Sequence, residues 1–166
     1  MQRHEVSFLV DAPPARVWRL FHPKPPPGAT VPRTFSHPGG SITILNEGDE
    51  NGQGLVRTCT FPVPRYLLSR GRARSWELVV AVREKEYARY QALGKPPWST
   101  AEGSHSLEPL DGGQRTRLTF VETFHIPNPV MRWLFERRVH RFISAQNTRT
   151  YATVLAHLGP VTQEPR

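Results

Sequence analysis

Glu122 is the residue whose setting points most directly to chemistry. It lies in the run from Arg115 to Ile126, where the residues two apart share one strand face: Thr116, Leu118, Phe120, Glu122, Phe124 and Ile126. A carboxylate buried without a partner in such a row would be strongly unfavourable, so it should be paired, protonated or facing a wet cavity. Apolar surroundings would raise its pKa and suit it to act as a general acid or base. The alternative is a bulge or an edge position that turns Glu122 outward.

Two arginines are complementary candidates. Arg138 falls in an apolar stripe between Phe135 and Phe142, where an inward guanidinium would pair with Glu122 or hold a ligand carboxylate or phosphate in a bidentate manner. Arg57 shares a strand face with Cys59, and its guanidinium could likewise point inward and bind an acidic group. The alternative for both is an arginine whose stem crosses apolar neighbours while its charge reaches solvent.

Other reactive side chains form no recognisable site. The seven histidines show no close metal-ligand spacing, and neither a P-loop nor a dinucleotide-binding glycine pattern occurs. Cys59 is the single cysteine, which excludes an intrachain disulfide and suits a core thiol. We therefore expect no metal and no cofactor.

The elements that must position these residues are mostly strands. Period-two alternation predicts strands over 4–10, 41–45, 55–61, 73–82, 102–107 and 115–126, separated by turn signals such as Asp111-Gly112-Gly113. The 73–82 strand would place Trp76, Leu78, Val80 and Val82 on one face. Residues 84–93 fit helix by propensity and strand by their place in a meander; we predict strand.

Helices are predicted near both ends. Residues 11–21 form the first, with Asp11 as N-cap and an end before Pro23. Residues 128–158 form a long second helix, whose apolar stripe drifts, so it either bends near 144–148 or wraps around a curved sheet. Between the first helix and the meander, the Pro-rich segment 23–40 is predicted to be a stiff loop, with a short helical turn at 30–35 as the alternative.

Length, composition and charge limit the kinds of protein that this chain can be. The chain has 166 residues, is 37% hydrophobic and contains no apolar run long enough to span a bilayer. Its net charge is +8, and almost all of its positively charged residues are arginines. Such a field favours anionic partners, namely nucleic acid, acidic lipid or acidic ligands, although arginine also serves as a general surface cation. We expect a cytoplasmic protein with one domain over 1–160 and a short tail over 161–166.

The order of elements, together with HEVSFLVDAPPARVWRLF at the start and LEPLDGGQRTRLTFVETF later, resembles the START-like (SRPBCC) superfamily of helix-grip proteins. That group includes polyketide cyclase/dehydrase-like and coenzyme Q-binding proteins. The "APxxVW" pattern matches Ala12, Pro13, Val17 and Trp18, and the resemblance spans essentially the whole chain. It implies an α+β fold in which a curved antiparallel sheet wraps around the C-terminal helix, with short helices after the first strand and a mostly apolar cavity. It carries no catalytic residues across.

This resemblance and the candidate residues lead to three hypotheses. The first is a carrier that binds a hydrophobic or amphipathic small molecule, such as a lipid, quinone or polyketide. The second is a cyclase or dehydratase that uses Glu122 as acid or base, with Arg138 stabilising an enolate. The third is a basic protein that binds a ribosome, nucleic acid or anionic membrane through the last helix. The expected ligand-binding residues are Arg57, Trp76, Tyr90, Phe120, Glu122, Phe124, Phe135, Arg138 and Phe142.

Overall fold

The computed structural model describes the whole chain except residues 24, 26–27, 38, 68–69, 96–98 and 165–166. The described residues form one antiparallel sheet of nine strands in the order β2-β3-β4-β5-β6-β7-β8-β1-β9. The strands are β1 (Gln2–Val10), β2 (Arg33–His37), β3 (Gly40–Asn46), β4 (Val56–Pro62), β5 (Arg72–Arg83), β6 (Tyr87–Lys95), β7 (Ser99–Leu110), β8 (Arg115–His125) and β9 (Val161–Gln163). Consecutive strands from β2 to β8 are neighbours, and β1 then pairs with β8. The predicted strands are confirmed, although β6 begins at Tyr87 because residues 84–86 form the turn after β5.

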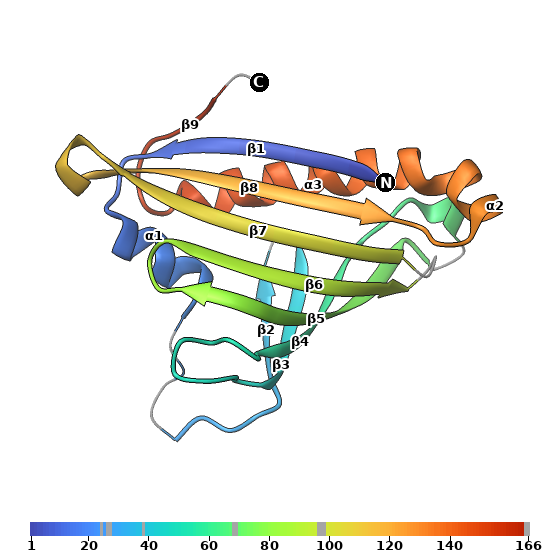
Figure 1. Cartoon of the computed structure of the whole chain (residues 1–166), viewed down its shortest axis with the longest axis horizontal. Helices are drawn as coiled ribbons and strands as arrows, with labels where there is room; N and C mark the ends of the chain where they lie inside the picture. Colours follow the sequence, from blue (N-terminus) through green and yellow to red (C-terminus); the bar gives the residue numbers. More distant parts are fainter. Residues whose placement is uncertain (24, 26–27, 38, 68–69, 96–98, 165–166) are drawn as a thin grey trace.

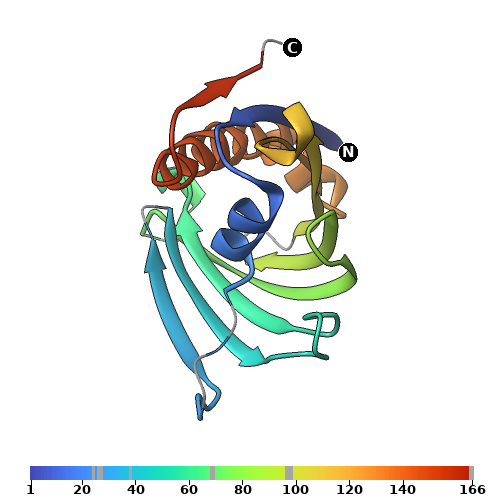
Figure 2. The same cartoon turned by 90° about the vertical axis from the view of Figure 1, so that its left-hand side faces the viewer.

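The helical elements lie on the concave side of this sheet (Figures 1 and 2). They are α1 (Pro14–Phe21), α2 (Pro129–Met131), the π-helical turn η3 (Arg132–Glu136) and α3 (Arg137–Leu155). The single 3-10 turns η1 (Arg65–Leu67) and η2 (Asp111–Gly113) follow β4 and β7. The expected helix-grip architecture, a curved sheet around a long C-terminal helix, is confirmed (Figure 2).

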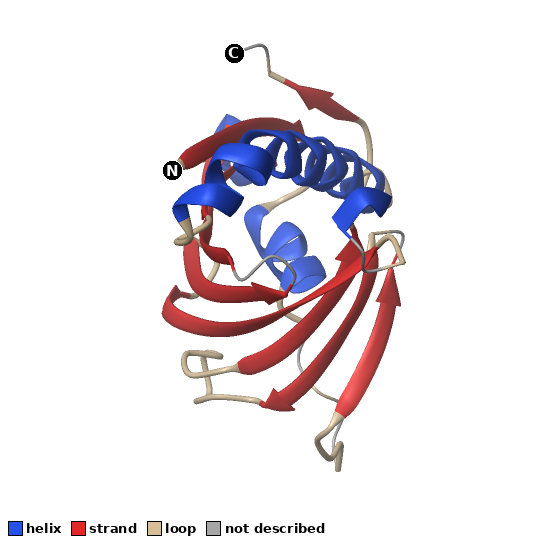
Figure 3. Ribbon diagram, turned by 90° about the vertical axis from the view of Figure 1, so that its right-hand side faces the viewer, coloured by secondary structure: helices blue, strands red, loops and turns tan. Residues whose placement is uncertain are grey.

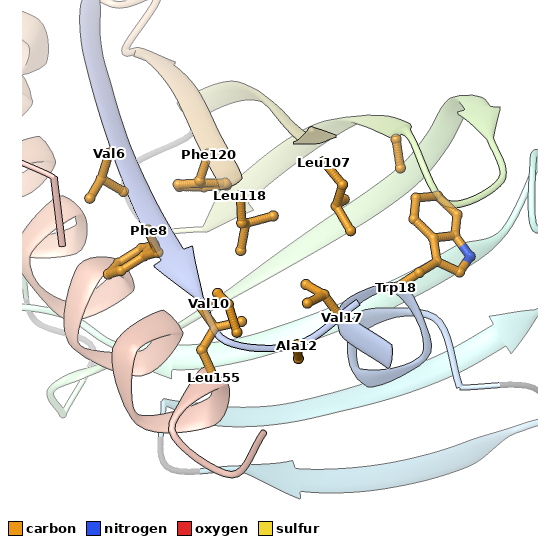
Figure 4. Close-up of a cluster of buried hydrophobic side chains, with 11 residues drawn as sticks. Val6, Phe8, Val10, Ala12, Val17, Trp18, Leu107, Leu118, Phe120 and Leu155 are labelled. Carbon is orange, nitrogen blue, oxygen red and sulfur yellow. The ribbon is translucent and has the colours of Figure 1, made fainter. Parts of the chain in front are cut away.

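Alternating burial sets which face each strand turns to the helix. In β8 every second residue from Thr116 to Phe124 is buried, as the sequence pattern predicts. β1 shows the same period, with Val6, Phe8 and Val10 buried. These side chains join Val17 and Trp18 of α1 and Leu155 of α3 in the larger core cluster (Figure 4). α1 therefore closes one end of the sheet because its Val17 and Trp18 complete this core.

A second core cluster lies toward the other end of α3. It contains Val63, Leu67, Ala73, Phe124, Ile126 and Val139, with Met131, Phe135 and Ile143 packed against it. Because α3 contributes Leu155 to the first cluster and Val139 to the second, one helix spans both cores.

Several local expectations were wrong. Asp11 does not cap α1, whose N-cap is Pro13 without a side-chain bond, since two prolines already fix the first turn. Residues 33–37 form the edge strand β2, because pairing with β3 outweighs the local turn signals. Residues 161–163, expected in a tail, form β9 against β1.

The face predicted for β5 was also wrong. A bulge between Val79 and Ala81 changes the alternation, so before it Ala73, Ser75 and Val79 are buried and Trp76 is 48% exposed. The apolar residues that suggested a core face therefore lie on the outer surface at this end of the strand.

The closing helix differs from a regular one at η3. An i→i+5 turn rotates the chain less per residue than an α-turn, so the apolar stripe changes phase there. Val139, His140 and Ser144 consequently face inward, and Arg138 is exposed. α3 itself runs without interruption through 144–148, so the drift of the stripe is explained by η3.

Candidate functional site

The inner face of the sheet carries a group of polar side chains centred on Glu122. Its side chain is buried between β8 and α3, and Asn147 of α3 donates a hydrogen bond from Nδ2 to Glu122 Oε2 at 3.0 Å. Burial, with a smaller contribution from the Glu77 charge, outweighs the lowering effect of the Asn147 bond and raises the pKa of this carboxyl to about 7. Glu122 can therefore exist in either protonation state near neutral pH.

A polar strip continues from Glu122 along the contact between β1 and α3. His4 is the strand partner of Glu122, and its Nε2 lies 3.0 Å from Thr148 Oγ1. Thr148 donates to the Ser144 carbonyl at 3.0 Å, and Ser144 Oγ lies 3.3 Å from His140 Nε2. This strip replaces purely apolar packing between the helix and the sheet.

Tyr90 reaches the same face two strands away. Strand pairing aligns Tyr90 of β6 with Gly103 of β7, and Gly103 with Glu122 of β8. The Tyr90 ring occupies the space that a side chain at Gly103 would need. Burial raises the pKa of Tyr90 well above its usual value, with the Glu122 and Glu77 charges adding to it, so the phenol stays protonated and can donate a hydrogen bond.

A half-buried ion pair lies beside Tyr90. Arg57 Nε on β4 donates to Glu77 Oε2 on β5 at 2.8 Å, and Ser75 Oγ donates to Glu77 Oε1 at 2.9 Å. The Arg57 guanidinium lies 5.5 Å from the centroid of the Tyr90 ring. Burial alone would lower the pKa of Arg57, and the Glu77 carboxylate more than offsets this, so the pKa rises.

Cys59 lies near this ion pair. Burial raises the pKa of its thiol, and the Glu77 charge adds to this effect, which keeps the thiol protonated and unreactive.

Two histidines meet at the α1 end of the face. His22 follows α1 and stacks on Trp18 at 4.0 Å, and its Nε2 lies 2.8 Å from Nε2 of His105 on β7. Burial, together with the smaller effect of the Arg57 charge, lowers the pKa of His22 to about 4. Burial lowers the pKa of His105 to about 3, with His22 and Arg57 adding to it. Both rings are therefore neutral at physiological pH, and one donates to the other.

Aromatic rings surround these polar groups. Tyr151 of α3 lies 4.6 Å from Phe120 and 5.1 Å from Phe21, measured between ring centroids. Arg57, Cys59, Tyr90 and Tyr151 are all half-buried rather than fully buried, although they lie on the inner face. The inner face thus combines aromatic surface with a few fixed polar groups.

The structure brings together only some of the expected ligand-binding residues. Arg57, Tyr90, Phe120, Glu122 and Phe124 share the inner face of the sheet. Phe142 is half-buried on α3, and Phe135 stacks on Tyr66 at the far end, at 6.0 Å. Trp76 and Arg138 are exposed and lie apart from this group, so the expected pairing of Arg138 with Glu122 is replaced by the Asn147 bond.

Sequence reasoning missed Asn147, Glu77, His22 and His105. The opposite charges of Arg57 and Glu77 on neighbouring strands were a usable signal, because they are direct partners in the β4–β5 ladder. The histidine pair joins residues 83 positions apart and had no local signal.

The charges of the site balance internally. Arg57 is neutralised by Glu77, the two histidines are neutral, and Glu122 is protonated in a large fraction of molecules near neutral pH. Among the described residues no group of three or more His, Cys, Asp or Glu side chains could hold a metal ion. None of their helices is long and apolar enough to cross a membrane. Chemically, the site can donate and accept hydrogen bonds and transfer a proton through Glu122.

Known proteins resemble this chain at the level of family and fold. A family model described as "Polyketide cyclase / dehydrase and lipid transport" matches residues 1–158. No curated protein matches the chain significantly.

Among solved structures, the Zhui aromatase/cyclase from Streptomyces sp. R1128 is 16% identical, with a TM-score of 0.67 over 95% of this chain and 93% of that one. A protein from Thermus thermophilus has a TM-score of 0.65 at 14% identity, covering 95% and 97% of the two chains. Ara h 8.0201 has a TM-score of 0.61 at 17% identity, covering 95% and 97%. At these identities the structures show a shared fold.

Proposed function

Because the chain belongs to the polyketide cyclase / dehydrase and lipid transport family, we propose that it binds a hydrophobic small molecule between the sheet and α3. The observation that carries this proposal is the inner face itself, where half-buried aromatic rings stand beside a few fixed hydrogen-bonding groups. Ligand sites usually have this composition. A fully packed core would leave no accessible surface on Tyr90 and Tyr151.

The balance of charge narrows the class of ligand. The sequence suggested that Arg57 would hold a carboxylate or phosphate, but its guanidinium is already bonded to Glu77. An acidic ligand would therefore bring an uncompensated charge into a buried site. We propose a neutral ligand, largely aromatic or alkyl, whose carbonyl or hydroxyl group hydrogen-bonds to Tyr90 or to Glu122.

The first test is native mass spectrometry of the purified protein, followed by solvent extraction of any bound molecule. A second arm titrates the protein with N-phenyl-1-naphthylamine, a neutral probe that fluoresces in apolar surroundings, and with the anionic probe anilinonaphthalene sulfonate. We expect the neutral probe to bind at least about tenfold more tightly, a difference of about 1.4 kcal/mol.

Tyr151→Ala should weaken binding of the neutral probe, because Tyr151 lies against Phe120 on the inner face. Trp76→Ala is the matched control, since it removes an aromatic ring from the outer face. Equal losses in both variants, or tighter binding of the anionic probe, would contradict the proposed site.

A second candidate function, cyclisation or dehydration of a polyketide-like substrate, is favoured by one observation. Glu122 has a pKa of about 7 within an apolar strand face, which suits a general acid or base at neutral pH. Arg138 is too exposed to stabilise an enolate there, and Tyr90, as a protonated phenol on the same face, is the donor we propose instead. Glu122→Gln should abolish turnover of an identified substrate while leaving its binding intact; unchanged turnover would exclude this mechanism.

A further inference from the structure

Exposed apolar side chains gather at the end of the molecule opposite α1. Val130, Trp133 and Leu134 of α2 and η3 are 64%, 84% and 41% exposed. Tyr66 of η1 is also exposed, and its ring stacks on that of Phe135 in η3, with the ring centroids 6.0 Å apart. Figure 3 looks onto this end of the molecule and shows the short helices on either side of it. We call Tyr66, Val130, Trp133 and Leu134 the apolar tip.

The local fold holds the tip outward. Glu136, at the end of η3, is buried and accepts a hydrogen bond from the Ile126 backbone N–H at 2.8 Å. Met131 and Phe135 pack against the second core cluster. Because Met131, Phe135 and Glu136 face the interior, the remaining side chains of this segment, Val130, Trp133 and Leu134, face outward.

The surface around the tip is positively charged. Five exposed arginines accompany it: Arg65, Arg132, Arg137, Arg138 and Arg141. The sequence from 123 to 163 contains one acidic residue, Glu136, which is buried. The sequence from 61 to 76 contains none. In these two stretches of sequence the arginines therefore have no exposed carboxylate close to them along the chain.

This combination matches the chemistry of an anionic lipid surface. Tryptophan favours the boundary between headgroups and acyl chains, and arginines around it are attracted to acidic headgroups. The phosphates of a nucleic acid would attract the arginines, but they would not favour exposed valine and leucine side chains. We propose that the apolar tip inserts into the surface of an anionic bilayer while the arginines contact its headgroups.

The position of the tip gives this docking a structural context. The core cluster behind it includes Phe124, which lies on the same strand face as Glu122. Docking would thus occur at one end of the sheet–helix interface. Membrane docking depends only on residues at the surface, so it can be tested separately from binding of the proposed ligand.

The test is co-sedimentation with vesicles of phosphatidylcholine containing about 30% phosphatidylglycerol, compared with pure phosphatidylcholine. We expect binding only to the anionic vesicles. Trp133→Ala and the double variant Arg132→Glu/Arg137→Glu should each weaken it on the order of tenfold. The double variant Arg16→Glu/Arg19→Glu is the matched control, because it makes the same charge change on α1 at the opposite end (Figure 1), and it should retain most of the binding.

Insertion itself is tested with vesicles made from brominated lipids, which quench a tryptophan that enters the bilayer. The wild type should be quenched, and Trp133→Phe should bind vesicles without comparable quenching. Equal loss of binding in the α1 control would indicate general charge attraction and overturn the proposal. No vesicle binding, with a dimer in sedimentation analysis that Trp133→Ala dissociates, would instead assign the tip to a second copy of this chain.

Discussion

At the scale of single residues, the position of Glu122 could be predicted and its partner could not. Strict alternation along 115–126 favours the buried face for its side chain, and this holds because β8 pairs with both neighbours without a bulge. Its bond to Asn147 depends on how α3 lies across the sheet, and the phase of α3 depends on η3. A regular helical stripe therefore selected Arg138 and missed Asn147.

Glu122→Gln should stabilise the protein in a pH-dependent way. The folded-state pKa of about 7 lies above the value of 4.5 expected when the chain is unfolded, so Glu122 favours folding fully below about pH 4.5 and loses this contribution as pH rises through about 7. The variant mimics the protonated form, and its advantage over wild type in free energy of unfolding should grow by about 2 kcal/mol from about pH 5 to about pH 8.

Urea unfolding at the two pH values measures this difference. His22 and His105 add a dependence of opposite sign, since their lowered pKa values favour folding as pH rises, and both proteins share it. Glu50→Gln, at an exposed position, is the matched control and should show no such growth. A constant difference between Glu122→Gln and wild type would mean that the carboxyl titrates normally.

At the scale of elements, the strands were predicted well and the helices less so. Strand signals are local, and antiparallel neighbours reinforce them, so even the ambiguous 84–93 segment was placed correctly. The bulge in β5 and the π-turn in η3 each insert one residue into a regular repeat, and no composition signal marks either. Each reverses which side chains face inward, which explains the wrong placement of Trp76 and Arg138.

η3 depends on Glu136, and Glu136→Ala should destabilise the protein by about 3 kcal/mol. The buried carboxylate accepts from the Ile126 N–H and lies 3.1 Å from His125 Nδ1, so it ties the end of β8 to the start of α3. Its removal leaves a buried N–H without an acceptor. Glu5→Ala, which removes an exposed carboxylate bonded to Arg3, should change stability by less than about 1 kcal/mol. Similar unfolding midpoints for both variants would show that Glu136 is dispensable.

At the scale of the whole molecule, one sheet and one helix are shared by two core clusters. The overall architecture could be predicted from element order, since a strand, a short helix, a meander and a long helix have few ways to bury their apolar faces together. The division of the core could not, because it depends on where α1 and η3 close the two ends. Sharing α3 should make the two clusters unfold together.

Leu155→Ala and Val139→Ala test this coupling from opposite ends of α3. We expect losses of about 3 and about 2 kcal/mol, each as one transition that far-ultraviolet circular dichroism and tryptophan fluorescence report at the same urea concentration. Val130→Ala removes the same groups as Val139→Ala at an exposed site and should cost less than about 0.5 kcal/mol. Separate transitions for the two probes would show that the clusters are independent units.

Gly103 has a consequence for how the selectivity of this protein can be altered. The Tyr90 ring occupies the room that any larger residue at position 103 would fill. A substitution there must displace the ring and the phenol with it, which changes the size and the hydrogen bonding of the interior in one step. If the proposed ligand binds beside Tyr90, position 103 is therefore a single point at which one substitution would change both the shape and the polarity of its binding site.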